Sequence, residues 1–280
     1  MRGELCFSGH PDPGGPVQRR QGMGINLEKQ DGVGIITMDR PPANSYDTGF
    51  ARELSSAIDD VRTDDELGAV VLRSASEKFF SAGADLGAFR ANTPRQRSMT
   101  VLIMHEALRK MENTPLIFIA EITGHALGGG LEISLACDLR FAALGDYRMG
   151  LPETNLGLFP ANGGTQRLPR LVGKSRGLEL IVKARTFSPE GAEKLGIVDR
   201  LFASSAECRQ RTLEYAAELA AGPREAIGHA KITTTLGFDA PLDLGNALER
   251  EAIGSVFASE DAAEGISAFL EKRKPDFKGR

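Results

Sequence analysis

Segments typical of buried strands alternate with helical segments over about 200 residues of this 280-residue chain, and only helical patterns follow. The runs "GAVVLRS" (68–74) and "LIFIAEITG" (116–124) are short and apolar, as strands buried on both faces are. Between them, residues 93–115 carry an apolar stripe at helical spacing and end at a proline. This order of segments predicts an α/β fold that ends in helices.

Local signals support the same interpretation near the start of the chain. Asp31-Gly32 lies between two strand-like segments and favours a tight β-hairpin turn. In 47–64, apolar side chains recur at helical spacing, and Asp47 stands where a helix N-cap is expected. The first 24 residues are rich in Gly, Pro and Arg and lack the apolar region of a secretory signal. Residues 1–24 are therefore interpreted as a disordered tail or a start-site artefact.

Charge and cysteine content exclude several classes of function. The net charge of −4 and the pI of about 5.7 give no general attraction to nucleic acid or to anionic lipid. No apolar run approaches the ~18 residues of a transmembrane helix. The three cysteines, Cys6, Cys137 and Cys208, are far apart, which indicates reduced thiols in a cytoplasmic protein. No spacing of histidine or cysteine predicts a metal site.

The stretch "SAGADLGAF" (81–89) is made mostly of small, uncharged residues and follows a predicted strand. Small residues allow another group to approach the backbone closely, so an exposed N–H there can donate a hydrogen bond. Taken alone, the stretch is better explained as a tight turn packed under a neighbouring helix. A second donor nearby is needed to distinguish the two.

A second donor is expected in "HALGGGLEISLACD" (125–138), where Gly128, Gly129 and Gly130 open a predicted helix. The first N–H groups of a helix have no partner within it, and glycine lets a ligand oxygen approach them. A packing turn or a phosphate loop also fits such a triplet. Neither a dinucleotide-binding glycine pattern nor a P-loop pattern occurs, however.

Two carboxylates accompany these glycines. Glu132 lies in the first helical turn among apolar neighbours, and Glu153 follows 21 positions later in another apolar segment. Each fits a simple structural charge, because an acidic residue is common in a first helical turn. Two enclosed carboxylates close together would instead differ in pKa, which suits one acid and one base around a water molecule.

Four motifs, in their order along the chain, resemble those of one family, the crotonase (enoyl-CoA hydratase/isomerase) superfamily. They are "FFSAGADL", "GHALGGGLEISLACDLRFA", "LPETNLGLFPANGGTQRLPRLVG" and "FLEKRKPDFKG", and the resemblance runs from about residue 25 to the C-terminus. It implies a spiral of repeated β-β-α units over 25–220 and a C-terminal helical oligomerisation region over 221–280. It also implies a homotrimer, or two trimers paired into a hexamer.

The resemblance implies a reaction as well, the hydration of a trans-2-enoyl-CoA to a 3-hydroxyacyl-CoA. The backbone N–H groups of Ala84 and Gly129 would form an oxyanion hole for the thioester carbonyl. The residue matching Glu132 activates water in hydratases of this family, and the residue matching Glu153 exchanges the proton at the α-carbon. No cofactor is implied, because coenzyme A is part of the substrate.

Further substrate contacts follow from the matched motifs. The positions implied are Ala82, Asp85, Leu86, Gly128, Ala161, Phe269 and Lys272. Of these, Phe269 and Lys272 belong to the tail 268–280, which is expected to be helical and to reach the adenine and 3′-phosphate of CoA in a neighbouring subunit.

The sequence departs from the family pattern at several positions. Ala161 stands where a glycine is usual, and Gly87 stands where a lysine often contacts the CoA phosphates, a contact that Arg90 could replace. Ser45-Tyr46 replaces small and aliphatic residues, and one extra residue separates the two glutamates.

Other activities stay open at this point. The main alternative is a double-bond isomerase, or another acyl-CoA reaction that passes through a thioester enolate, including the hydration of a branched or functionalised acyl-CoA. RNA binding occurs in some relatives through a lysine-rich helix. The matching helix here mixes its basic residues with acids and an apolar stripe, so nucleic acid is not expected as a partner.

Overall fold

The computed structural model describes residues 20–21 and 24–280. The predicted tail, 1–24, therefore lies outside the described residues except for 20–21 and 24. The strands are β1 (Arg20–Gln21), β2 (Ile25–Gln30), β3 (Val33–Met38), β4 (Ala69–Ser74), β5 (Phe79–Ser81), β6 (Ile117–Ile122), β7 (His125–Leu127), β8 (Leu139–Ala143), β9 (Met149–Gly150), β10 (Thr186–Phe187) and β11 (Arg200–Phe202).

Helices follow most of the strands and make up the C-terminal part. They are α1 (Thr48–Arg62), α2 (Leu86–Ala91), α3 (Pro94–Glu112), α4 (Gly129–Leu135), the 3₁₀ helix η1 (Glu153–Leu156), α5 (Gly164–Val172), α6 (Lys174–Val182), α7 (Pro189–Lys194), α8 (Ser205–Ala220), α9 (Arg224–Phe238), α10 (Leu242–Phe257) and α11 (Glu260–Glu271). None of the helices in the described ranges is long and apolar enough to cross a membrane.

The larger sheet has the strand order β1-β2-β3-β4-β6-β8-β11. From β3 to β11 the neighbours run parallel, and only β1–β2 and β2–β3 are antiparallel. Helices cover both faces of this sheet, which explains why β4 and β6 are almost continuously apolar. The predicted α/β class is confirmed.

A smaller sheet, with the order β10-β9-β7-β5, runs beside the first. Successive turns of the chain place one strand in each sheet and then a helix: β4, β5 and α2–α3, then β6, β7 and α4, then β8, β9 and η1. This is the repeated β-β-α spiral that the family motifs imply. Because each turn ends on the smaller sheet, the loops after β5, β7 and β9 are brought together.

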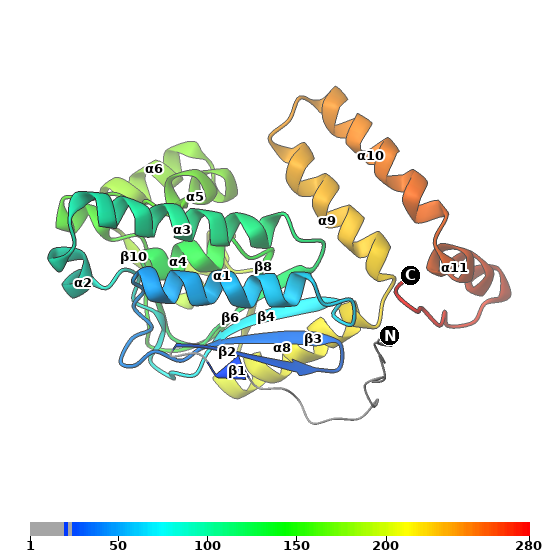
Figure 1. The fold of residues 1–280 in the computed structure, drawn as a ribbon, viewed down its shortest axis with the longest axis horizontal. Coiled ribbons are helices and arrows are strands. Elements are labelled where there is room, and N and C mark those ends of the chain that lie inside the picture. Colours follow the sequence, from blue (N-terminus) through cyan, green and yellow to red (C-terminus); the bar gives the residue numbers. More distant parts are fainter. Residues whose placement is uncertain (1–19, 22–23) are drawn as a thin grey trace, which may run out of the picture.

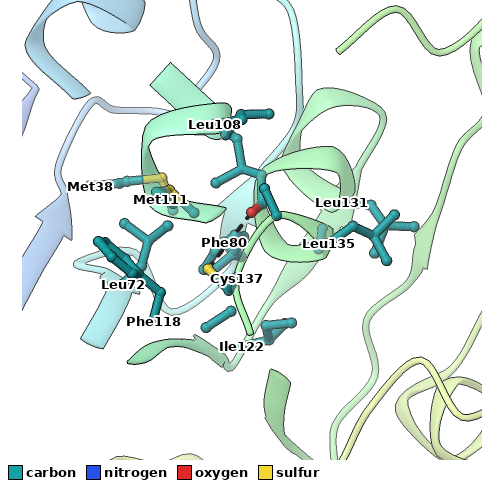
Figure 2. Packing of buried hydrophobic residues seen from close by; sticks show 14 of the residues in the cluster. Met38, Leu72, Phe80, Leu108, Met111, Phe118, Ile122, Leu131, Leu135 and Cys137 are labelled. Atoms are coloured by element: carbon teal, nitrogen blue, oxygen red, sulfur yellow. Dashed lines mark hydrogen bonds between the residues drawn. The ribbon is translucent and has the colours of Figure 1, made fainter. Parts of the chain in front are cut away.

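The helices form layers on the larger sheet. In Figure 1, α1 and α3 lie side by side over one face, and α8 covers the opposite face. The main hydrophobic cluster fills the first interface, and a smaller cluster lies beneath α8. Figure 2 shows part of the main cluster, into which Leu131 and Leu135 extend from α4. Burial of these side chains fixes the short helix that carries Glu132.

The local signals of the sequence are confirmed. Asp31 and Gly32 both have positive φ, +50° and +73°, as a tight turn between β2 and β3 requires. The Asp47 side chain accepts a hydrogen bond from the Phe50 N–H at 2.9 Å and so caps α1. The sequence did not predict α2, which is capped by Asp85 and has no buried residue.

The C-terminal helices are attached through a buried lysine. The Lys231 ammonium of α9 donates to the carbonyl oxygens of Met111 and Leu116, both at 2.7 Å, and pairs with Asp138 at 2.8 Å. Beyond this anchor, α9 and α10 form a hairpin that projects away from the sheets (Figure 1). The α10 helix has no buried residue, and several of its apolar side chains, such as Phe257, are exposed in the single chain.

The prediction that the tail 268–280 is helical is wrong. The α11 helix ends at Glu271, and Lys272 adopts a left-handed conformation with φ +56°. The left-handed Lys272 ends the helix, and Pro275 prevents a helix from continuing beyond it, since proline has no N–H for a helical hydrogen bond and disfavours helical geometry in the residue before it. The segment after α11 folds back instead, and the N–H of Lys278 donates to the Asp261 carboxylate at 2.6 Å.

Candidate active site

The loop after β5 leaves one peptide N–H free. Tyr46 pairs with the residues on both sides of Ala84: its N–H donates to the Gly83 carbonyl at 2.9 Å, and its carbonyl accepts from the Asp85 N–H at 2.9 Å. The Ala82 N–H is also used, by the Ala43 carbonyl at 2.9 Å. Across residues 24–280, no protein group accepts the Ala84 N–H. It is therefore available to a ligand.

A second free N–H belongs to Gly129, the first residue of α4. The Gly128 N–H is bound by the Gly150 carbonyl at 2.9 Å, whereas no acceptor for the Gly129 N–H occurs among the described residues. The two loops touch, since a Cβ built at Gly83 would lie 2.9 Å from the Gly129 nitrogen. Gly83 also has φ +88°, so both space and backbone conformation require glycine there.

A cavity of about 140 Å³ lies against these two loops. Its walls are mostly apolar, and its polar side chains are those of Tyr46, Glu132 and Glu153. The lining residues are Tyr46, Ala82, Ala84, Leu86, Phe89, Val101, Gly128, Gly129, Glu132, Pro152, Glu153, Leu156, Leu158, Phe159 and Ala161. Wider depressions of about 540 and 720 Å³ lie elsewhere, but both are open, and the larger one is lined mostly by charged side chains. The smaller cavity is the better candidate because polar groups converge in it.

Glu132 is 1% exposed and firmly held. Its Oε1 accepts the N–H of Asn162 at 2.7 Å and that of Gly164 at 2.8 Å, at the start of α5. Burial raises the pKa of Glu132, and the two N–H groups oppose that rise by stabilising the charged form. A Cβ at Gly164 would lie 2.9 Å from Oε1, so the close approach depends on glycine.

Glu153 begins η1 and is half-buried. Burial, and then the negative charge of Glu132, raise the pKa of Glu153 to about 7. Its Oε2 has no hydrogen-bond partner among the described groups. Its Oε1 faces Gly128, where a Cβ would lie 3.0 Å away. This carboxyl is thus next to the loop with the free Gly129 N–H, and it holds a proton more readily than an ordinary glutamate.

Tyr46 also belongs to this site, although the sequence singled it out only as a departure from the family pattern. Its side chain is 4% exposed, and its hydroxyl accepts a hydrogen bond from the Asn162 side-chain amide at 2.5 Å. Burial raises the pKa of Tyr46, and the charges of Glu132 and Glu153 raise it further. The tyrosine therefore stays neutral, close to both carboxylates.

Most of the predicted site residues meet at the cavity. Those that line it are Ala82, Ala84, Leu86, Gly128, Gly129, Glu132, Glu153 and Ala161. Asp85 does not line it, because its carboxylate accepts the Ala88 N–H at 3.0 Å as the N-cap of α2. Phe269 and Lys272 lie outside the lining as well, and Phe269 is 82% exposed.

No described group of three or more His, Cys, Asp or Glu side chains is arranged to hold a metal ion. The arrangement offers two backbone donors for an oxygen that gains negative charge, and two carboxyl groups in different environments for proton transfer.

Known proteins have sequences similar to this chain. Residues 28–280 match the family model described as enoyl-CoA hydratase/isomerase. A probable enoyl-CoA hydratase of Bacillus subtilis is 39% identical over 258 residues, which cover 91% of this chain and 98% of that protein. The human mitochondrial methylglutaconyl-CoA hydratase is 32% identical, and the match covers 96% of this chain and 84% of the human protein.

A solved structure is similar too. The crystal structure of an enoyl-CoA hydratase from Geobacillus kaustophilus HTA426 superimposes with a TM-score of 0.92 at 41% identity, covering 94% of this chain and 100% of that one. The match of the family model and of these relatives extends over nearly the whole chain. The chain therefore belongs to the enoyl-CoA hydratase/isomerase family of enzymes and has the crotonase fold.

Proposed function

We propose that this enzyme adds water to a trans-2-enoyl-CoA and forms a 3-hydroxyacyl-CoA. The observation that carries the proposal is the pair of carboxyl groups, Glu132 and Glu153, in one cavity with the free N–H groups of Ala84 and Gly129. An isomerase has to move one proton along the acyl chain, whereas a hydratase has to activate water and also protonate a carbon. Two carboxyl groups in unlike environments suit the second task.

The thioester oxygen sits between the Ala84 and Gly129 N–H groups in this mechanism. Both donors stabilise the oxygen as it gains charge, which makes the β-carbon electrophilic. Water attacks that carbon: the new C–O bond forms, the electrons of the C=C bond move toward the thioester oxygen, and Glu132 takes a proton from the water. Glu132 is suited to this step because two N–H groups favour its ionised form.

Glu153 completes the addition. Its pKa of about 7 means that the carboxyl still carries a proton near neutral pH. As the enolate collapses, the α-carbon takes this proton and the thioester carbonyl is restored. Transfer of the proton on Glu132 back to Glu153 through solvent resets the site. The reaction needs no cofactor apart from the coenzyme A of the substrate.

The direct test is a panel of enoyl-CoA thioesters that differ in chain length, branching and polar groups. Hydration is followed as loss of the absorbance of the conjugated thioester, with the hydroxylated product identified by mass. The methylglutaconyl ester belongs in the panel because a hydratase for it is among the relatives. A 3-enoyl-CoA that gains conjugation, with no 2-enoyl-CoA consumed, would replace the proposal with an isomerase.

A homotrimer, alone or paired into a hexamer, is the proposed assembly, with 221–280 as the oligomerisation region. Its support is the apolar surface of the C-terminal helices: Phe257 on α10 is 71% exposed, and Leu270 on α11 is 74% exposed. Side chains of this size are normally covered. Sedimentation of the full chain and of a chain lacking 268–280 should show a weaker oligomer for the shorter one. A cytoplasmic location stays a prediction from the cysteine content.

Lys272→Ala should raise KM for CoA thioesters several-fold and leave kcat nearly unchanged. The reason is the proposed contact between its ammonium group and the 3′-phosphate of CoA in a neighbouring subunit, a charge-assisted interaction that acts in binding alone. Lys274→Ala is the matched control, since it removes an equal charge two residues away. If Lys272→Ala weakens a substrate without the 3′-phosphate just as much, the contact is wrong.

A further inference from the structure

Three of the four polar groups of Asn162 form hydrogen bonds within the described part of the chain, and its side-chain oxygen does not. Its backbone N–H donates to Glu132, its backbone carbonyl accepts from Arg167 at 2.9 Å, and its side-chain NH₂ donates to the Tyr46 hydroxyl. The residue is 1% exposed, and its Oδ1 has no hydrogen-bond partner among the described groups. A buried acceptor without a partner lowers the stability of the folded protein, so we expect this oxygen to accept a hydrogen bond from a ligand or from water.

The Tyr46 hydroxyl supplies the complementary group. Because it accepts the Asn162 hydrogen at 2.5 Å, its own hydrogen is free for another acceptor. Its raised pKa keeps that hydrogen in place at neutral and alkaline pH. The ring has little freedom to turn away: it packs edge-on against Phe89, and it fills the space beside Gly129 in which a Cβ would overlap it.

The amide group that binds the Tyr46 hydroxyl therefore carries a free acceptor, and the hydroxyl carries a free donor. Tyr46 lines the cavity together with Glu132, and Asn162 is tied to Glu132 through its backbone N–H. A hydrocarbon chain satisfies neither the acceptor nor the donor, whereas an oxygen that donates one hydrogen and accepts another satisfies both. A water molecule has this property, and so does the hydroxyl group of an alcohol. In a hydratase, the oxygen of the water molecule becomes the oxygen of the product's 3-hydroxyl group when it adds to the β-carbon.

We infer that the Tyr46 hydroxyl and Asn162 Oδ1 together bind the oxygen that adds to the β-carbon, first as water and then as the 3-hydroxyl of the product. Tyr46 donates to this oxygen, Asn162 accepts one of its hydrogens, and the other hydrogen points to Glu132. One lone pair stays free for attack. The inference rests on the proposed hydratase function and adds a pair of water-binding residues to it.

Tyr46→Phe tests the pair, because it deletes only the hydroxyl and keeps the ring against Gly129 and Phe89. We expect kcat for hydration to fall about tenfold, as for the loss of one hydrogen bond, with KM changed less than about twofold. Tyr147→Phe is the matched control. It also deletes a buried hydroxyl, which donates to the carbonyl oxygens of Ile122 and Ala143, but it lies outside the cavity. It should lower Tm and leave kcat unchanged.

A binding measurement separates this inference from the proposed reaction. Calorimetry compares a 3-hydroxyacyl-CoA with the saturated acyl-CoA of equal length, in enzyme that also carries Glu153→Gln so that the hydroxylated ligand is not dehydrated during the titration. With Tyr46 present, this enzyme should prefer the hydroxylated ligand, and adding Tyr46→Phe should lose about tenfold of that preference while adding Tyr147→Phe keeps it. An unchanged preference in Tyr46→Phe, or an equal loss of affinity for both ligands, overturns the inference. Failure of the native enzyme to hydrate any enoyl-CoA would overturn the proposed function instead.

Discussion

Glu153→Gln should lower kcat for hydration by at least ~100-fold, as the loss of a general acid usually does. Glutamine keeps the size of the side chain and its contact with Gly128, but it cannot give a proton to the α-carbon. Glu132→Gln should have an effect of the same order, since an amide cannot take a proton from water. The amide oxygen can still accept the N–H groups of Asn162 and Gly164, so the fold should be unaffected.

The two substitutions should be far from additive. Both carboxyl groups act on one addition, and once either proton transfer fails the other has little left to accelerate. The double variant is therefore expected to be almost as active as the slower single variant. If Glu132→Gln kept full hydratase activity while Glu153→Gln lost it, chemistry through Glu153 alone would be indicated, as in an isomerase.

The same assignment predicts a pH dependence. Glu153 must be protonated to act as the acid, and its pKa is about 7. The protonated fraction of the free enzyme falls as the pH rises through this value, so kcat/KM for hydration should decline on the alkaline side. In Glu153→Gln the residual activity should lack that decline. The dehydration direction needs the ionised form, and its rate should rise over the same range.

Much of this site could be predicted from the sequence because its donors lie on local structures. Small residues after a buried strand, and glycines that open a helix, each indicate an accessible N–H within a few residues of chain. Glu132 and Glu153 could be identified for the same reason, since each is the acidic residue in an otherwise apolar segment. The spiral then brings these segments together, and the family motifs carried that information.

Other features depend on contacts that one sequence does not display. The strands of the smaller sheet have only two or three residues, too few for an alternating pattern to appear. The hydrogen bond between Tyr46 and Asn162 joins residues 116 positions apart. The sequence could mark Tyr46 as unusual, but only the packed structure shows that its hydroxyl faces the amide next to Glu132.

Gly129→Val should abolish turnover, with a loss of at least ~100-fold, the typical cost of removing one oxyanion-hole donor. The N–H itself survives the substitution, and the backbone of Gly129 does not have the positive φ that disfavours other residues. The obstacle is space. A Cβ at this position would overlap the ring of Tyr46, so the ring or the first turn of α4 has to move. A shift of α4 displaces the Gly129 N–H from the Ala84 N–H, and a shift of the ring disturbs the hydroxyl that binds Asn162.

The measurement has to separate a displaced donor from an unfolded protein. Gly254→Val is the control for the substitution itself, because Gly254 lies on α10, has no positive φ and would give a Cβ no neighbour within 4 Å in the single chain. Since α10 belongs to the proposed oligomerisation region, sedimentation has to show that this variant keeps the native assembly. Both variants should keep the native helix signal in circular dichroism, and only Gly129→Val should lose activity. Activity of the native order in Gly129→Val would show that a side chain fits beside this N–H without displacing it, and would contradict the prediction. Loss of the helix signal in Gly129→Val alone would mean that this glycine supports the fold rather than the chemistry.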